Sequence, residues 1–449
     1  MKSTTYFLGT GNTLITYIST SPHMIVSQGR SDSKQKLVGK ILEANDKASS
    51  RFGNIIKSRT AFIVVEEPDE VVGVEYNFWN FCGETYITRI KDLIGIAAER
   101  LERSPFTRRV SIPVWKSEDH LCGNPPALTE VSFLQMEGNL HVTAYIRSLD
   151  ALNYYDFNFD LVNYILQEVV NATEFEKGTM AMIIAIPHIY SRDYDRALEM
   201  SRDAEEVFGV TEYGAHLVED YFSTAWHSSL EAIYHQGKKK QTEWGEIFEG
   251  QAESRFIHRL LVEVENPYEM QIHDKAPFSR KYGIGYAHDY VICAKYIDSE
   301  VKEDILKEEE AYTYAERARY CQYDEQHIDQ LYTVINKLKQ DRNRRDCYVG
   351  ISRQWDIESD EPPCLRGYQF CSENSDELSG LFYMRSNDAY GAMHANMFAF
   401  STLTQYVTEL IGSKRHRYYH FALDAHIYSE FLEAVEDLLK PQTPTYSSG

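Results

Sequence analysis

Cys364 lies between arginine residues whose spacing could place a thiol and several guanidinium groups in one site. Arg345 precedes the cysteine by 19 residues, and Arg385 follows it by 21. A cysteine reacts as its thiolate, which nearby cations favour, and the planar fork of arginine suits phosphate. These residue types predict covalent chemistry on a phosphorylated substrate. A lone cysteine is by itself more often an inert buried thiol, so its surroundings decide the matter.

The motif that follows Cys364 also occurs in the first half of the chain. Each copy has Arg-Ser-x-Asp, an Asn eleven residues after the Arg, and His-Ile-Tyr beginning forty-one residues after it. The two sets are Arg147, Ser148, Asp150, Asn158, His188 and Tyr190, and Arg385, Ser386, Asp388, Asn396, His426 and Tyr428. The offset is constant, because 385 − 147, 396 − 158 and 426 − 188 all equal 238.

The repeat extends upstream of these residues. Two further pairs of segments correspond, namely Arg108-Arg109 with Arg344-Arg345, and Pro125-Pro126-Ala127 with Pro362-Pro363-Cys364. The offsets there are 236 and 237, so only small loop changes separate the copies. Self-similarity over half a chain indicates duplication of a structural unit. We predict two homologous domains, 1–205 and 206–449.

The elements that must position these residues recur in the same order in both halves. Strands are expected after each arginine pair (VSIPVW and CYVGISR) and after each Pro-Pro (EVSFLQ and RGYQFC). A largely apolar helix follows each Asn, with apolar residues at three- and four-residue steps, and a strand then carries His-Ile-Tyr. The predicted class is mixed α/β (α+β). No glycine-rich loop opens a helix, which argues against a Rossmann or P-loop nucleotide site.

The composition limits the classes of partner. The net charge of −22 over 449 residues disfavours a nucleic acid polymer or an anionic membrane surface, although a local arginine pocket could still hold a small phosphate. The seven cysteines are scattered and form no CxxC pair, which argues against a zinc site or a disulfide framework. No signal peptide or membrane-spanning run is recognisable. We expect a cytoplasmic protein without a bound metal.

The ordered motifs resemble thymidylate synthase and the related pyrimidine nucleotide hydroxymethylases, most strongly over 328–428 and more weakly over 210–327. In that family an arginine pair, a Pro-Cys nucleophile, Arg-Ser-x-Asp, Asn and His-x-Tyr follow one another at these spacings. The resemblance implies two thymidylate-synthase-like domains packed through their sheets. It also implies transfer of a one-carbon unit to C5 of a pyrimidine nucleoside monophosphate, most readily dUMP, from the folate 5,10-methylenetetrahydrofolate.

The resemblance assigns a role to each matching residue. Cys364 would add to C6 of the base, a step that makes C5 nucleophilic. The amide of Asn396 would read the uracil edge, where relatives that prefer cytosine are expected to carry Asp. The remaining substrate-binding residues would be Arg385, Ser386, His426, Tyr428, Arg108 and Arg109. Asp388 would face the folate. Tyr314 and Asp289 are the nearest matches to two further catalytic positions, with a solvated surface aspartate as the alternative for Asp289.

Ala127 occupies the nucleophile position of the first domain, which therefore cannot form the C6 adduct. The family is dimeric, and each site borrows an arginine pair from the partner. The tandem chain is thus expected to form a pseudo-dimer, with further homodimerisation left open. An inactive second site would contain Arg147, Ser148, Asn158, His188, Tyr190, Arg344 and Arg345. That domain could be a scaffold or could bind nucleotide without turnover.

Two other functions for the whole chain stay open. One is a non-catalytic nucleotide sensor or scaffold, and the other is a hydroxymethylase acting on a cytosine nucleotide.

Overall fold

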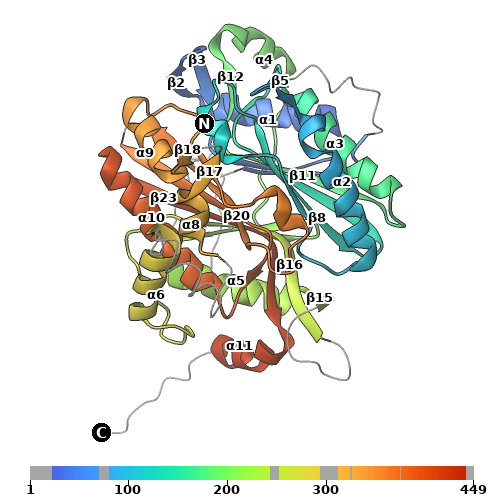
Figure 1. Cartoon of the computed structure of the whole chain (residues 1–449), viewed down its shortest axis with the longest axis vertical. Coiled ribbons are helices and arrows are strands. Elements are labelled where there is room, and N and C mark those ends of the chain that lie inside the picture. The colour runs from blue at the N-terminus through green and yellow to red at the C-terminus, as the bar shows by residue number, and fades with distance from the viewer. Residues whose placement is uncertain are drawn as a thin grey trace.

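The protein is described by a computed structural model that covers residues 23–69, 80–242, 252–293, 312–323, 326–374 and 376–440. Each half contributes one large sheet (Figure 1). The first sheet runs in the order β1 (His23–Ser27), β4 (Ala61–Val65), β11 (Glu176–Ile184), β9 (Asn139–Ile146), β8 (Leu128–Met136) and β7 (Ser111–Pro113). The second sheet runs β13 (Gly209–Thr211), β14 (Gly214–Glu219), β16 (Ala252–Val264), β23 (Arg415–Tyr428), β21 (Glu377–Met384), β20 (Leu365–Asn374) and β19 (Tyr348–Gly350).

The second sheet also contains β15 (Lys238–Thr242), which pairs with β16, and β22 (Asn387–Asp388), which pairs with β23. Once these two strands and β13 are set aside, the two sheets have the same topology. The first pair is parallel in each sheet, β1 with β4 and β14 with β16. The next pair is antiparallel in both sheets (β4 with β11, and β16 with β23), and the one after it is parallel (β11 with β9, and β23 with β21). The last two pairs are antiparallel in both (β9 with β8 and β8 with β7, and β21 with β20 and β20 with β19). The predicted duplication of an α/β unit is therefore confirmed. The expected boundary after residue 205 falls between α4 (Tyr194–Met200) and β13, and it stays a prediction.

The helices pack on the outer faces of the sheets, where apolar side chains of each half form a separate core. The first half has α1 (Arg30–Ala44), α2 (Tyr86–Arg103), α3 (Tyr155–Asn171) and α4. The second has α5 (Phe222–Gln236), α6 (Arg280–Tyr286), the π-helical η4 (Ala287–Ile292), α8 (Tyr314–Arg319), α9 (Gln330–Gln340), α10 (Met393–Ile411) and α11 (Leu432–Leu439). In the described residues, no helix combines the length and the apolar character that crossing a bilayer requires.

The inner faces of the two sheets pack against each other. This third core combines aromatic and aliphatic residues of both halves, including Phe62, Tyr145, Tyr383 and Phe421. The rings of Phe62 and Phe421 meet edge to face with centroids 5.5 Å apart. Because strand side chains alternate between faces, each sheet can bury one face under its helices and the other against its partner. The chain thus folds as a pseudo-dimer.

Pro187 accounts for the main difference between the sheets. β11 ends at Ile184, and Pro187 begins a separate strand, β12 (Pro187–Tyr190). β12 belongs to a small sheet in the order β10 (Leu149–Asp150), β12, β3 (Gly53–Lys57) and β2 (Asp46–Ser50). The residue 238 positions later is Ala425, and there β23 continues unbroken for 14 residues. Proline cannot donate a ladder hydrogen bond, so it interrupts a central strand where alanine does not.

One disulfide departs from the expectation drawn from the cysteine spacing. Cys82 and Cys122 are bonded, with their Cα atoms 5.6 Å apart. The turn between β5 (Asn80–Phe81) and β6 (Glu84–Thr85) brings Cys82 to the loop that precedes β8. The two residues are 40 positions apart, a separation that carries no sequence signature.

Candidate active site

Cys364 lies in the loop that enters β20 and is half-buried. The guanidinium of Arg385 forms hydrogen bonds to the backbone of this loop. Its Nε donates to the carbonyl oxygen of Pro363 at 3.1 Å, and its Nη2 donates to that of Pro362 at 2.7 Å. The hydroxyl oxygen of Tyr314 accepts from the backbone N–H of Leu365 at 3.4 Å. Arg385 and Tyr314 therefore fix the position of the thiol from both sides of the loop.

The first half of the chain completes this site. Nη1 of Arg385 donates to the carbonyl oxygen of Arg108 at 2.8 Å, and Nη2 of Arg108 donates to the hydroxyl of Tyr428 at 2.9 Å. Arg108 and Arg109 both line the cavity of about 370 Å³ that contains Cys364. That cavity brings together Cys364, Tyr314, Arg385, Ser386, Asp388, Asn396, His426 and Tyr428 with the two arginines, as the motif order predicts.

The imidazole of His426 lies next to a buried carboxylate, that of Asp424. Asp424 accepts from Lys240 Nζ at 2.6 Å. Nδ1 of His426 lies 2.8 Å from the Asp424 carboxylate, and Arg108 lies 3.7 Å from it. Burial would raise the pKa of Asp424, but Lys240, His426 and Arg108 lower it below its usual value. Burial together with Arg108 lowers the pKa of His426. Nδ1 of His426 faces the backbone carbonyl oxygen of Asp424 at 3.4 Å, and its buried Nε2 has no hydrogen-bond partner in the described structure. Such an atom is suited to accept from a ligand hydroxyl.

Asn396 lies on the first turns of α10 and faces the same cavity. Its Oδ1 accepts from the hydroxyl of Tyr286 at 2.8 Å, and its Nδ2 donates to Oδ1 of Asn387 at 3.2 Å. This network orients the amide before any base arrives. Tyr286 was not anticipated from the sequence. A tyrosine at the end of a short helix carries no distinctive signal there.

The structure does not bring Asp289 to the cavity. Asp289 is on η4, its side chain is 42% exposed, and its carboxylate accepts from Nδ1 of His288 at 2.7 Å. The π-helical turn changes which side chains face inward, and Tyr286 and Tyr290 stack toward Tyr314 instead. Among the described residues Asp289 is thus a surface aspartate outside the wall of the Cys364 cavity, and its catalytic role stays a prediction.

Ser386 lies between β21 and β22, and Asp388 ends β22 just before the turn that leads into α10. Ser386 is buried in the cavity wall. Oδ1 of Asp388 accepts from the backbone N–H groups of Tyr390 at 3.1 Å and Gly391 at 3.0 Å. The turn therefore holds the Asp388 carboxylate at the cavity.

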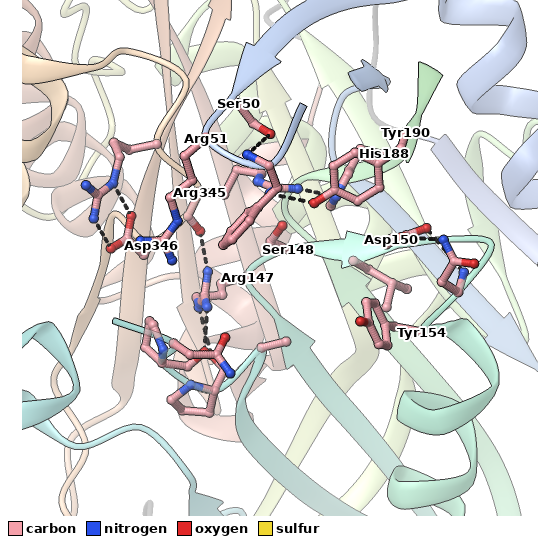
Figure 2. Close-up of a pocket in the computed structure, with 18 of the residues that line it drawn as sticks. Ser50, Arg51, Arg147, Ser148, Asp150, Tyr154, His188, Tyr190, Arg345 and Asp346 are labelled. Atoms are coloured by element: carbon pink, nitrogen blue, oxygen red, sulfur yellow. Dashed lines mark hydrogen bonds and ion pairs between the residues drawn. The ribbon is translucent and has the colours of Figure 1, made fainter. Parts of the chain in front are cut away.

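A second cavity, of about 1020 Å³, surrounds Ala127 (Figure 2). It contains the corresponding set Arg147, Ser148, Asn158, His188 and Tyr190, with Arg344 and Arg345 from the second half. Nη1 of Arg147 donates to the carbonyl oxygen of Arg345 at 2.7 Å, which mirrors the bond between Arg385 and Arg108. Tyr86 mirrors Tyr314, because its hydroxyl accepts from the N–H of Ala127 at 2.9 Å. The two cavities are thus related by the pseudo-symmetry.

Both halves of the chain are similar to one known protein family. The family model for thymidylate synthase matches residues 62–211 and 286–447. A protein of Methanococcoides burtonii named "Putative thymidylate synthase" is 28% identical over 220 residues, which are 49% of this chain and 91% of that protein. One of the same name from Methanocaldococcus jannaschii is 30% identical over 192 residues, covering 41% of this chain and 81% of its own. The solved thermostable thymidylate synthase A from Bacillus subtilis aligns with a TM-score of 0.41 at 16% identity, over 48% of this chain and 83% of that one.

Proposed function

Because the chain belongs to the thymidylate synthase family, we propose that its Cys364 cavity transfers a one-carbon unit to C5 of a pyrimidine nucleoside monophosphate, most readily dUMP. The observation that carries this proposal is the convergence of Cys364 with Arg108, Arg109 and Arg385 in one cavity. A volume of about 370 Å³ lies within the range of small-ligand sites. The arginines offer a phosphate site next to a thiol, which a purely structural cysteine would not need.

The side chains of the cavity support a division of roles. Cys364 Sγ adds to C6 of the base, and the electron pair of the C5–C6 bond moves toward O4 and makes C5 nucleophilic. Asn396, held by Tyr286, contacts N3 and O4 of uracil. His426 Nε2 and the hydroxyl of Tyr428 bind the sugar hydroxyl, while Arg108 and Arg109 bind the phosphate. Arg385 keeps the Cys364 loop in place and supplies positive charge close to the thiolate.

The donor proposed is 5,10-methylenetetrahydrofolate, and Asp388 is the residue that would hold it. One carboxylate oxygen of Asp388 is occupied by the turn, and the other can accept a hydrogen bond from the N–H groups of a pterin-like ring. Bound folate would supply the one-carbon unit. Whether hydride or water completes the product depends on how well the closed site excludes water.

The test is a turnover assay on the full chain with dUMP and 5,10-methylenetetrahydrofolate, in which the product is identified by mass. A methyl or hydroxymethyl product is expected from the wild type. Cys364→Ala should abolish turnover and leave nucleotide affinity within about tenfold, because the thiol bonds to substrate only during reaction. Nucleotide binding without product in the wild type would favour the sensor, and product from dCMP alone would favour the cytosine hydroxymethylase.

A further inference from the structure

The Ala127 cavity cannot carry out the thiol chemistry, yet it is the larger of the two, at about 1020 Å³ against about 370 Å³. We propose that it is a non-covalent binding site for a nucleoside di- or triphosphate. This proposal goes beyond the function of the Cys364 cavity and does not depend on turnover there. Three features support it: Arg345 has no carboxylate partner among the described residues, two further arginines lie at the mouth of the cavity, and aromatic side chains line its inner end.

The first observation is the loss of a buried carboxylate. Arg108 lies 3.7 Å from Asp424, but the residue 238 positions before Asp424 is the apolar Ile186. Arg345 takes the place of Arg108 in this cavity, because Arg147 bonds its carbonyl oxygen as Arg385 bonds that of Arg108; the structural offset is therefore 237, one more than the sequence alignment of the arginine pairs gave. The guanidinium of Arg345 contacts Nε2 of His188 and donates to the hydroxyl of Tyr190 at 3.2 Å. Both partners are neutral, since burial and the charge of Arg345 lower the pKa of His188 well below its usual value. Figure 2 shows Arg345 directed at this pair.

Four aspartates line the cavity wall. Asp193 lies 3.8 Å from Nε of Arg192, and Asp341 accepts from the backbone N–H of Asn343 at 2.9 Å. Asp346 is bonded to Arg344 at 2.5 Å and to Lys337 at 2.8 Å. Asp150 accepts from the backbone N–H groups of Leu152 and Asn153 and so closes its own turn. In the described residues none of these carboxylates lies within ion-pair distance of Arg345. A guanidinium in this position favours an anionic ligand.

The second observation is a pair of arginines at the mouth. Arg51 is at the tip of the hairpin between β2 and β3, where its guanidinium lies 4.5 Å from the ring of Phe52 and donates to the carbonyl oxygen of Gly123. Arg192 lies 4.3 Å over the ring of Tyr190. The residue 238 positions after Arg192 is Glu430, which is not in the wall of the Cys364 cavity. These arginines extend the cationic region beyond what a single phosphate group needs.

The third observation is the inner end of the cavity, next to Ala127. Phe81 and Tyr86 pack there with ring centroids 4.5 Å apart, and Phe157 lies 5.9 Å from Tyr86. Asn158 is 3% exposed, and its Oδ1 has no hydrogen-bond partner in the described structure. An aromatic wall with a buried amide oxygen suits a nucleobase that carries an N–H donor. A base at this end would direct its phosphates past Arg345 toward Arg51 and Arg192.

The test is calorimetric titration of the full chain with dUTP, dUMP and inorganic triphosphate. A single dUTP site, tighter than the site for inorganic triphosphate, is expected. The double variant Arg51→Ala/Arg192→Ala should weaken dUTP binding by about tenfold or more, whereas dUMP turnover at Cys364 should stay unchanged. Arg108→Ala is the matched control and should leave dUTP binding intact.

Three results would overturn the proposal. One is the absence of dUTP binding to a chain that still turns over dUMP. Another is dUTP binding that is lost in Arg108→Ala but kept in the mouth variant, because the ligand would then occupy the Cys364 cavity. The third is equal affinity for dUTP and inorganic triphosphate, which would indicate an anion site with no role for the base. If the wild-type chain does not turn over dUMP, that result counts against the function proposed for the Cys364 cavity and not against a binding site in the Ala127 cavity.

Discussion

Nη1 of Arg385 donates to the backbone carbonyl oxygen of Arg108 at 2.8 Å, across the interface between the two halves of the chain. The mirror bond joins Arg147 to Arg345 at 2.7 Å. Each half thus supplies the arginine pair of the other half's cavity. On the proposed function, a single half separated from its partner would lack part of the phosphate site.

The crossed arrangement predicts unequal effects for the two arginine pairs. Arg108→Ala/Arg109→Ala should weaken dUMP binding by one to several orders of magnitude, since each charge-assisted phosphate bond contributes roughly 1.5–3 kcal/mol. Arg344→Ala/Arg345→Ala should do less to dUMP turnover, because those residues line the Ala127 cavity. KM for dUMP measures both, with thermal denaturation as the control for folding. A larger loss from the second pair would refute the crossed arrangement.

Base choice should depend on Asn396. In Asn396→Asp the carboxylate accepts from the exocyclic amine of cytosine and no longer donates to O4, so the ratio of kcat/KM should shift from dUMP toward dCMP. A complementary contact of this kind is worth roughly 1–3 kcal/mol. The new carboxylate also faces Oδ1 of Asn387, so the melting temperature should be recorded alongside. A wild-type preference for dCMP would show that the role given to Asn396 is wrong.

Tyr286 should matter more than Asp289. Tyr286→Phe removes the phenol that donates to Asn396, which frees the amide to rotate and should lower kcat/KM for dUMP by about tenfold. Asp289→Asn alters a side chain outside the cavity wall and should change kcat/KM by less than about twofold. Steady-state kinetics of the two variants side by side decides the point. If only the Asp289 variant lost activity, a carboxylate relay would have to be restored.

Acid should destabilise the fold partly through His420. This ring accepts from Nδ2 of Asn387 at 2.8 Å and bonds the hydroxyl of Tyr418 at 2.9 Å. Burial lowers its pKa to about 3, against about 6.5 in the unfolded chain. Between these values the unfolded state binds the extra proton, so the free energy of unfolding falls as pH decreases. Denaturation at about pH 7 and about pH 4 should show a smaller loss in His420→Gln than in the wild type. Equal losses would exclude this role.

The sequence predicted the relationships that repetition preserves. The constant offset from Arg147 to Arg385 predicted two sheets of one topology, and the ordered motifs predicted which side chains meet around Cys364. Those residues occupy strand ends and the first turns of α10, where local periodicity and motif spacing determine position. The exchange of arginine pairs followed from the dimeric character of the family rather than from any local pattern.

The features that the sequence did not predict depend on backbone geometry or on distant neighbours. Tyr286, at the end of α6, lines the cavity, whereas Asp289 on the π-helical η4 is not in its wall, and no residue pattern marks the change from α- to π-helix. The bond between Cys82 and Cys122 follows from the path of two loops. Ile186 stands where the second half has Asp424, and the contacts of Arg345 with the neutral His188 and Tyr190 cannot be read from the sequence. Such contacts join segments far apart in sequence, where propensity and periodicity carry no information.

The proposed function depends on a covalent bond between Cys364 and the pyrimidine substrate. Incubation of the full chain with 5-fluoro-dUMP and 5,10-methylenetetrahydrofolate, followed by intact-protein and peptide mass spectrometry, tests it directly, because fluorine at C5 blocks release of the adduct. We expect a single nucleotide–folate adduct per chain, located on the peptide that contains Cys364 and absent from Cys364→Ala. The absence of any adduct, or an adduct that persists in Cys364→Ala, would contradict the account.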